Sequence, residues 1–401
     1  MFKRAVQFVS DNSILLILGA GAGLLWANLA PTSYAWLSDL NLAAIPKAFE
    51  PDFAWHGVSL HYLVNDVLMA FFFALAGKEV WEALLPGGAL RDGRRAATPI
   101  LCAIGGMIGP ATIYLVMVAL SGQWTGLQQG WAIPCATDIA FSYLIARWVF
   151  GKTHPAVPFL LLLAIVDDAL GLVVLAVFYP VHAIHPLWLL LSALGVGTGL
   201  LMRRSGIQSF WWYLAGPGAL SWLGFALSGI HPALGLLPII PTMPHARVPA
   251  KTSHWEISHQ AGTLDHFEAF WKRPVEGILG LFGLLNAGVT LAVASGPTWF
   301  ILVALLAGKP FGICLTGLFC TRLLRLHLPA GIRLREILVI GCAAGIGFTV
   351  ALFVATVAFP KGAVQDAAKM GALASFLAAG TTLLAARVLR AGIPSTHAEG
   401  R

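Results

Sequence analysis

Long apolar runs alternate with short polar connections along the whole chain. Most runs have about 20 residues, the length at which a helix crosses the hydrocarbon core of a membrane. We predict twelve membrane-spanning segments, at 12–30, 59–85, 96–120, 131–150, 155–179, 186–202, 210–228, 230–241, 274–294, 298–320, 335–359 and 367–390. The longest polar interruption is 242–273. The pattern predicts an all-α polytopic membrane protein that forms a single integral-membrane domain over residues 1–401.

The composition supports lipid, not water, as the main surroundings. Hydrophobic residues make up 58% of the chain and charged residues 11%, whereas soluble domains have roughly 25% charged residues. The net charge of +7 is interpreted as basic cytoplasmic loops. Because no basic run is interleaved with aromatic residues, we expect no nucleic-acid partner.

The distribution of lysine and arginine orients the predicted helices. If the N-terminus is cytoplasmic, all but five of the 25 basic residues fall on the cytoplasmic side. Lys47, Lys361 and Lys369 then fall outside, and Lys78 and Lys309 lie within spans. A wrong number of spans would scramble this asymmetry. The sequence therefore predicts a multi-pass protein of the bacterial inner membrane with both termini in the cytoplasm.

The five cysteines lie in or beside apolar segments, and no two of them form a CxxC motif. Their most economical interpretation is as small packing residues. Neither a resident metal nor a cofactor is expected.

Several ionisable side chains lie inside the predicted spans. Each charge at a helix centre costs about 2.5–3.5 kcal/mol on insertion scales, so each indicates a function or a paired partner. These residues are Asp66, Asp138, Asp167, Asp168, Glu276 and Lys309.

Asp138 follows a proline in the sequence GWAIPCATD, which ends at Asp138 itself. Pro134 removes a backbone donor and disfavours helix at the residue before it, which predicts an unwound stretch in this span. The Thr137 hydroxyl and freed carbonyl groups would then be available to a cation. Asp138 would compensate the positive start of the following half-helix. The alternative is a kinked packing helix whose Asp138 bonds a neighbour.

Asp167 and Asp168 are adjacent in the middle of a span. Neighbouring helical residues point about 100° apart, so we expect one carboxylate to face an ion and the other to take a cationic partner. The two would titrate as a coupled pair. Lys309, in AGKP, is the natural partner, which would hold the lysine charged. A lysine that loses its proton when an ion binds remains an alternative.

Two triplets of spans, 96–179 and 298–390, each have an interrupted middle helix. Pro134 interrupts the first, and Gly341, Gly345 and Gly347 weaken the second. Four predicted spans separate the triplets, so the third and tenth spans cross the membrane in opposite directions and the triplets have opposite orientations. Two unwound helices that cross within an inverted repeat are typical of the ion sites of secondary transporters.

The motifs GWAIPCATDIAF, LAIVDDALG, NAGV, AGKPFGI and GIGFT resemble the signatures of bacterial NhaA-type sodium/proton antiporters. The resemblance covers nearly the whole chain, and this family is itself one of the inverted-repeat transporters. It implies electrogenic export of Na⁺ or Li⁺ in exchange for inward protons, with a role in pH and sodium homeostasis.

The resemblance also assigns roles to residues of the ion site. Asp168 would be the main sodium ligand, with Asp167 beside it and able to pair with Lys309. Thr137 and Asp138 would lie where the unwound helices meet. Asp138 would balance two positive helix starts, and Lys309 would balance two negative ends.

Four further residues match positions linked to pH response in the family, namely Glu79, His231, Asp265 and His266. Trp81 and Ala83 depart from the charged pattern that the family has after Glu79. The segment 31–58 is a candidate for a homodimer-forming hairpin.

Three other classes fit less well. An intramembrane aspartyl protease would need YD and GxGD motifs, which are absent, so the chain is not expected to be an enzyme. In an ATP-driven pump, Gly151-Lys152-Thr153 would end a P-loop, but Ala146 occupies the position of its first glycine. A sodium-coupled solute transporter would need room for a large substrate, which the close DD pair and Lys309 disfavour.

Overall fold

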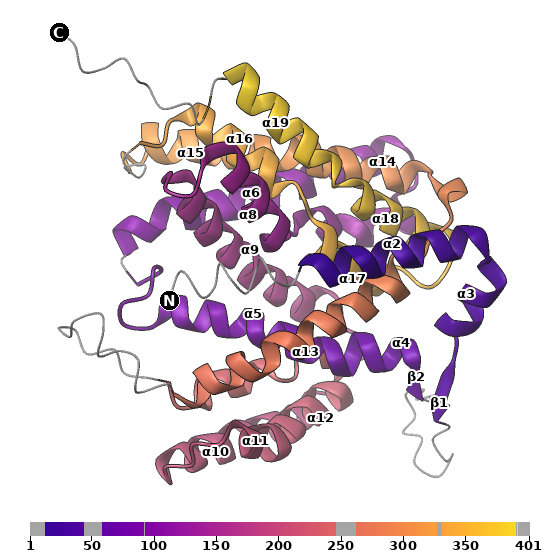
Figure 1. Ribbon diagram of the computed structural model, residues 1–401, viewed down its shortest axis with the longest axis vertical. Helices are drawn as coiled ribbons and strands as arrows, with labels where there is room; N and C mark the ends of the chain where they lie inside the picture. Colours follow the sequence, from indigo (N-terminus) through magenta and orange to yellow (C-terminus); the bar gives the residue numbers. More distant parts are fainter. Residues whose placement is uncertain are drawn as a thin grey trace. The chain divides into compact units, whose positions relative to one another are not determined.

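The computed structural model describes residues 13–43, 58–91, 93–245, 262–326, 331–389 and 391, and nearly all of its regular structure is helical (Figure 1). The chain divides into two compact units. Unit 1 comprises Met1–Gly88 and Leu172–Gly288, and unit 2 comprises Ala89–Gly171 and Val289–Arg401. Unit 2 thus contains nearly all of both predicted triplets. The prediction of a single domain stays a prediction.

Unit 1 consists of helices and one short strand pair. In chain order its elements are α2 (Ser13–Leu29), α3 (Pro31–Ser38), β1 (Asn41–Ala43), β2 (Val58–Ser59), α4 (Leu60–Tyr62), a π-helical turn (Leu63–Leu68), α5 (Met69–Leu84), a 3-10 turn (Pro186–Trp188), α10 (Leu189–Arg204), α11 (Phe210–Tyr213), a second π-helical turn (Leu214–Gly218), α12 (Ala219–Ser228), two 3-10 turns (Pro232–Leu234 and Leu237–Thr242) and α13 (Thr263–Asn286). The strands pair antiparallel, with Asn41 opposite Ser59 and Ala43 opposite Val58. Residues 44–57 of the candidate dimer hairpin lie outside the described residues.

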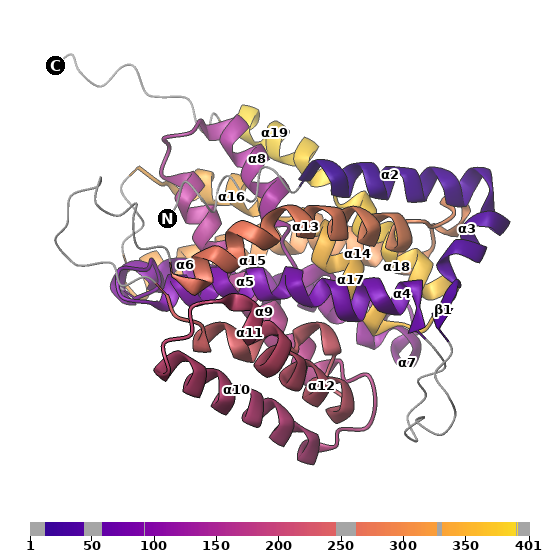
Figure 2. The same ribbon diagram turned by 60° about the horizontal axis from the view of Figure 1, so that its bottom comes forward.

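Helix α2 packs closely against the C-terminal half of α13, as Figures 1 and 2 show. The contact depends on glycine: a Cβ atom at Gly19 would lie 2.0 Å from the carbonyl oxygen of Gly280, and one at Gly23 would lie 2.3 Å from that of Leu284. Small residues at such crossings let two backbones approach where lipid supplies no hydrophobic drive.

Unit 2 carries the two broken spans. Its elements are α6 (Gly93–Leu120), α7 (Trp124–Leu127), a 3-10 helix (Gln128–Cys135), α8 (Ile139–Phe150), α9 (Ala156–Phe178, whose last residues belong to unit 1), a 3-10 turn (Leu291–Val293), α14 (Gly296–Val303), a π-helical turn (Ala304–Gly308), α15 (Lys309–Arg322), α16 (Leu334–Ala344), α17 (Phe348–Ala358), α18 (Ala363–Ala374) and α19 (Leu377–Leu389).

The chain bends sharply at both predicted interruptions. The segments Trp124–Cys135 and Ile139–Phe150 meet at 50°, and Leu334–Ala344 and Phe348–Ala358 meet at 52°. The first break falls at residues 136–138, just after Pro134, where the Thr137 and Asp138 side chains offer the backbone alternatives to helical hydrogen bonds. The second falls at Gly345–Gly347, where glycine weakens the helix.

Glycines also bring α6 and α15 into close contact. A Cβ atom at Gly312 would lie 2.0 Å from the carbonyl oxygen of Gly105, and one at Gly109 would lie 2.4 Å from that of Gly308. Lys309 follows Gly308 directly, and Pro310 follows Lys309. Because Pro310 has no N–H, the helix before it adjusts locally to a π-helical turn. The close packing of α6 against α15 therefore fixes the position of Lys309 within unit 2.

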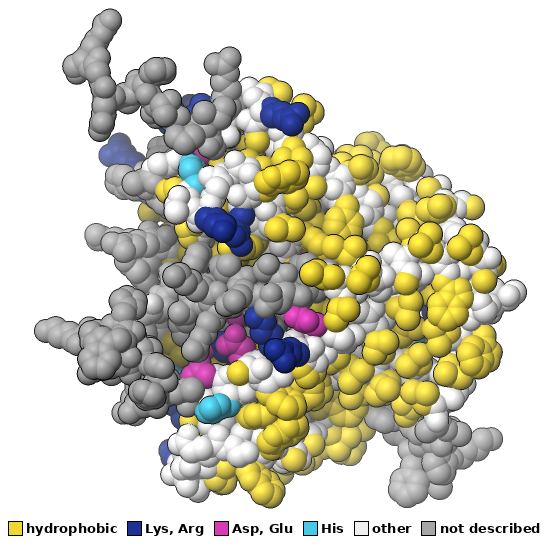
Figure 3. All heavy atoms as spheres, viewed as in Figure 1, with side chains coloured by type: hydrophobic (Ala, Val, Ile, Leu, Met, Phe, Trp, Pro, Cys, Tyr) yellow, Lys and Arg dark blue, Asp and Glu magenta, His cyan; other side chains and the backbone are white. Residues whose placement is uncertain are grey.

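Within the described residues, six helices are long and apolar enough to cross a membrane, or up to eight if each bent pair is one span. The count of twelve stays a prediction. Large side chains that point outward include Leu120 and Leu29, with exposed fractions of 83% and 81%. Hydrophobic side chains likewise cover much of the face in Figure 3. Such a surface suits a multi-pass membrane protein.

Two expectations about the spans need correction. Helix α13 begins at Thr263, not at 274, because its first turns are amphipathic: Leu264 and Phe267 are buried while His266 is exposed. The segment 230–241 forms two 3-10 turns rather than an α-helix, since its prolines remove backbone donors.

Candidate ion-binding site

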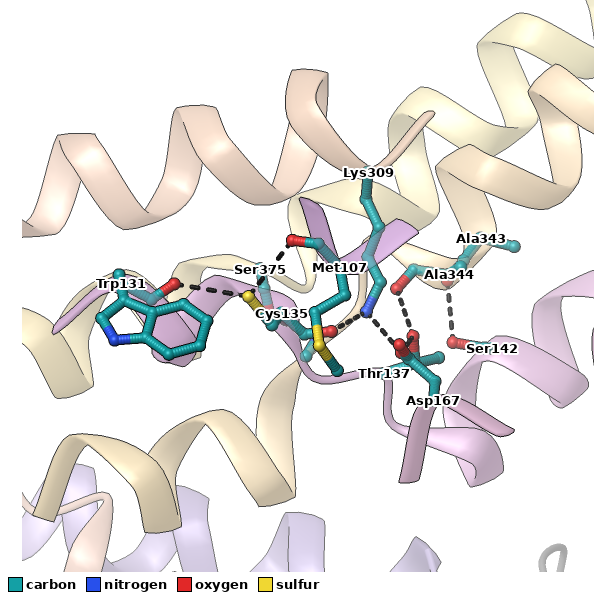
Figure 4. Close-up of polar contacts among 11 residues, drawn as sticks. Met107, Trp131, Cys135, Thr137, Ser142, Asp167, Lys309, Ala343, Ala344 and Ser375 are labelled. Carbon is teal, nitrogen blue, oxygen red and sulfur yellow. Dashed lines mark hydrogen bonds and ion pairs between the residues drawn. The ribbon is translucent and has the colours of Figure 1, made fainter. Parts of the chain in front are cut away.

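Lys309 and Asp167 form a buried ion pair in unit 2. Lys309 Nζ lies 2.7 Å from Asp167 Oδ2, and both side chains are fully buried. The same ammonium donates to the carbonyl oxygen of Cys135 at 2.5 Å, at the end of the 3-10 helix (Figure 4). Lys309 is thus paired with an aspartate, and it also faces the negative end of one half-helix.

Thr137 connects this ion pair to the second broken span. Its hydroxyl oxygen lies 2.6 Å from Asp167 Oδ2 and 3.2 Å from the carbonyl oxygen of Ala344, the last residue of α16 (Figure 4). A hydroxyl has one proton, so it can donate to only one of these acceptors at a time. Thr137 therefore joins the carboxylate, the first break and the second break.

Asp138 lies at the starts of two half-helices. Its Oδ1 accepts a hydrogen bond from the N–H of Phe141 in the first turn of α8, at 3.4 Å. Its Oδ2 accepts from the N–H of Thr349 in the first turn of α17, at 3.1 Å, and from the Thr349 hydroxyl. The first N–H groups of a helix lack partners within the helix and carry partial positive charge. One carboxylate thus caps both helix starts.

Further polar groups of the second break are paired with the first broken span and with α18–α19. The Ser142 hydroxyl donates to the carbonyl oxygen of Ala343 at 2.8 Å (Figure 4). The N–H of Asp138 donates to the carbonyl oxygen of Ile346 at 2.7 Å. The N–H of Gly347 donates to Ser375 Oγ at 3.3 Å. The two breaks are therefore hydrogen-bonded to each other, because the carbonyl groups of Ala343, Ala344 and Ile346 all accept from donors of the first broken span.

Asp168 differs from its neighbours. It is half-buried, and among the described residues no hydrogen bond to its carboxylate is found, although it interacts electrostatically with Asp167, Asp138 and Lys309. Asp167 Oδ1 is buried and likewise has no hydrogen-bond partner among the described residues. Two carboxylate groups of this site therefore retain oxygen atoms that protein donors do not occupy.

The described residues contain no group of three or more His, Cys, Asp or Glu side chains that could hold a metal ion. A transported Na⁺ is cargo and not a resident cofactor. It would be held by few carboxylates together with neutral oxygen atoms, and hard cations accept such mixed oxygen ligands.

The candidate pH-response residues lie in unit 1. Glu79 is half-buried next to Lys78, which is paired with Glu82 at 2.8 Å and with Glu268 at 2.5 Å. Glu79 interacts electrostatically with all three of these groups. Sequence reasoning missed Glu268 because it placed this residue in a polar loop, whereas it lies on the buried side of α13.

The other three candidates have different surroundings. His231 Nδ1 accepts from the N–H of Ala233 at 3.3 Å and lies 3.8 Å from Asp66 Oδ1. Asp265 accepts from the N–H of Gly262 at 2.8 Å, which caps α13. His266 is exposed. The candidates therefore have separate surroundings: His231 lies beside Asp66, and Glu79 lies beside the charged groups around Lys78.

An all-α membrane protein with two broken helices that meet at a buried aspartate–lysine pair has the features of the inverted-repeat secondary transporters, a class that includes the NhaA antiporters. The family model described as Na⁺/H⁺ antiporter 1 matches residues 3–387. The chain belongs to this family of Na⁺/H⁺ antiporters.

Individual relatives match over almost the entire chain. The Na⁺/H⁺ antiporter NhaA of Jannaschia sp. (strain CCS1) is 50% identical and covers 96% of this chain and 98% of the relative. The NhaA proteins of Desulfitobacterium hafniense (strain DSM 10664 / DCB-2) and Geotalea uraniireducens (strain Rf4) are 44% and 43% identical, with 96% and 97% of this chain covered. The whole protein, and not one segment of it, is therefore comparable with these antiporters.

Proposed function

We propose that this protein exports Na⁺ or Li⁺ from the bacterial cytoplasm in exchange for inward protons, across the inner membrane and with both termini cytoplasmic. It acts as a transporter and not as an enzyme, and the whole chain works as one transport domain. The observation that carries the proposal is the Asp167–Lys309 pair next to Asp168, because it combines buried titratable groups with carboxylate oxygen atoms free to bind a cation.

Asp168 is the main cation ligand in this proposal. Its carboxylate has no competing hydrogen bond within the described structure, and Asp167 Oδ1 is unoccupied beside it. Na⁺ and protons compete for these oxygen atoms. When the site faces the cytoplasm, the ionised carboxylates bind Na⁺; when it faces the more acidic exterior, protons bind and Na⁺ leaves.

Lys309 links cation binding to the charge of the site. While the site is empty, its ammonium compensates Asp167 and the Cys135 carbonyl group. A cation that shares Asp167 weakens this pair, because two positive charges then compete for one carboxylate. With Asp167, Asp168 and Lys309 the site can exchange more than one proton for one Na⁺, so we propose that transport is electrogenic.

Asp138 and Thr137 support the site rather than carry the ion alone. Asp138 balances the two helix starts, and Thr137 adds a neutral oxygen atom next to Asp167. Glu79, His231, Asp265 and His266 are proposed to adjust the response to pH, which would serve pH and sodium homeostasis. A homodimer through the hairpin at 31–58 is part of the same proposal.

The test uses everted membrane vesicles that hold an acid-inside pH gradient, reported by a fluorescent amine. Addition of Na⁺ or Li⁺ should collapse the gradient in vesicles that contain the protein. Vesicles from cells without the gene are the control. No collapse with either cation, at any pH from mildly acidic to alkaline, would refute the proposed function.

A further inference from the structure

Thr349 makes both of the contacts that hold one oxygen atom of Asp138. Its backbone N–H donates to Asp138 Oδ2 at 3.1 Å, and its hydroxyl donates to the same atom. The contact of the other carboxylate oxygen, Oδ1, with the N–H of Phe141 is long at 3.4 Å. Asp138 and Thr349 are each only 5% exposed, so water contributes little to the support of this charge.

We propose that Thr349 is a positioning residue of the ion site, whose hydroxyl fixes the Asp138 carboxylate at the starts of α8 and α17. This inference rests on the proposed function, because it assumes a cation at Asp168. Thr349 does not touch the cation. It acts through Asp138.

The hydroxyl adds a donor that the helix itself cannot supply. The N–H groups at the starts of α8 and α17 would be present whichever side chains occupy these positions. A hydrogen bond from a hydroxyl to an ionised carboxylate is stronger than one between neutral groups. In a buried site, the loss of that donor leaves the negative charge with less support. The hydrogen bond from the Thr349 hydroxyl thereby holds the negatively charged carboxylate of Asp138 in one position.

The position of that charge matters for the cation. Asp138 and Asp168 interact electrostatically. The negative charge of Asp138 attracts a cation bound at Asp168, and the attraction is strong because Asp138 is buried in a low-dielectric interior. If the carboxylate of Asp138 is poorly held, the cation loses part of this attraction. Thr349 should therefore affect the apparent affinity for Na⁺, and not only the amount of folded protein.

The chain offers a matched control for this effect. Ser142 is also fully buried, and its hydroxyl also links α8 to the second broken span, but it donates to the neutral carbonyl group of Ala343. Deleting this hydroxyl removes a bridge of the same kind without touching a carboxylate. A purely structural role for hydroxyl bridges predicts the same kinetic result at both positions.

The experiment measures the apparent KM for Na⁺ and the maximal rate in everted vesicles for wild type, Thr349→Val, Thr349→Ser and Ser142→Ala. Valine keeps the shape of threonine and removes the hydroxyl. We expect Thr349→Val to raise KM by about threefold or more, which corresponds to about 0.7 kcal/mol at about 1.4 kcal/mol per tenfold. Thr349→Ser and Ser142→Ala should stay near the wild-type KM.

Each outcome decides the proposal. A KM for Thr349→Val equal to that of wild type, an equal rise in Thr349→Ser, or an equal rise in Ser142→Ala would overturn it. If valine prevents insertion into the membrane, Thr349→Ala compared with Thr349→Ser replaces it. A wild-type protein that exchanges no Na⁺ would instead refute the proposed function, so the two failures are distinguishable.

Discussion

Lys309 Nζ lies 2.7 Å from Asp167 Oδ2, and neither side chain is exposed. The same carboxylate oxygen accepts a hydrogen bond from the Thr137 hydroxyl, and the same ammonium donates a hydrogen bond to the carbonyl oxygen of Cys135. The pair is therefore not an isolated contact. It ties helix α15 to α9 and to the first broken span within unit 2.

Replacing Lys309 should strongly reduce both the stability of the protein and its exchange activity. Lys309→Met leaves Asp167 buried without a compensating charge, and breaking one partner of a buried pair costs about 3–5 kcal/mol. We expect a clear fall in the thermal unfolding temperature of the purified protein in detergent, together with loss of exchange. Lys309→Met combined with Asp167→Asn should recover part of the stability.

The control for this prediction is Lys152→Met, which removes an exposed lysine. Surface substitutions usually change stability by no more than about 0.5 kcal/mol. An unfolding temperature for Lys309→Met that matches that of Lys152→Met would show that the buried pair contributes nothing to the folded state.

The contact between α6 and α15 should tolerate no side chain at Gly312. A Cβ atom there would lie 2.0 Å from the Gly105 carbonyl oxygen, so Gly312→Ala must separate the helices. Such overpacking typically costs about 1–3 kcal/mol. We expect lower thermal stability and slower exchange, because the start of α15 positions Lys309.

Gly197→Ala is the matched control, since a Cβ atom at Gly197 in α10 meets nothing within 4 Å. Alanine favours helix over glycine by about 1 kcal/mol, so this variant should be as stable as wild type or more so. Equal behaviour of the two alanine variants would contradict the close packing of α6 and α15.

The acidic cluster of unit 1 depends on Lys78. Lys78→Met should leave Glu82 and Glu268 largely buried without their counter-charge, and so lower the unfolding temperature. Adding Glu268→Gln removes one of the unpaired charges and should restore part of the loss. Thermal unfolding of both variants in detergent provides the measurement. A double variant that is less stable than Lys78→Met would rule out charge compensation as the role of Lys78.

The sequence predicted those parts of the site that carry charge. A buried aspartate or lysine is rare enough in an apolar segment to stand out, which is how Asp138, Asp167 and Lys309 were found. Pro134 and the glycines at 345 and 347 likewise placed the breaks, since they weaken helix wherever they occur.

Neutral partners could not be predicted in this way. Thr349 is an ordinary residue in an apolar helix, and its contact with Asp138 joins residues 211 positions apart. Glu268 was placed in a loop because average hydropathy does not detect an amphipathic extension such as the start of α13. Both roles depend on which helices pack together, and neither local composition nor periodicity contains that information.

The central claim is that Asp168 binds the transported cation. The most direct test compares wild type with Asp168→Asn in everted vesicles at matched amounts of inserted protein. The amide keeps the size of the side chain and removes its charge. Na⁺ should collapse the pH gradient in wild-type vesicles and should have no effect with Asp168→Asn. Unchanged exchange in Asp168→Asn would contradict it and remove Asp168 from the ion site.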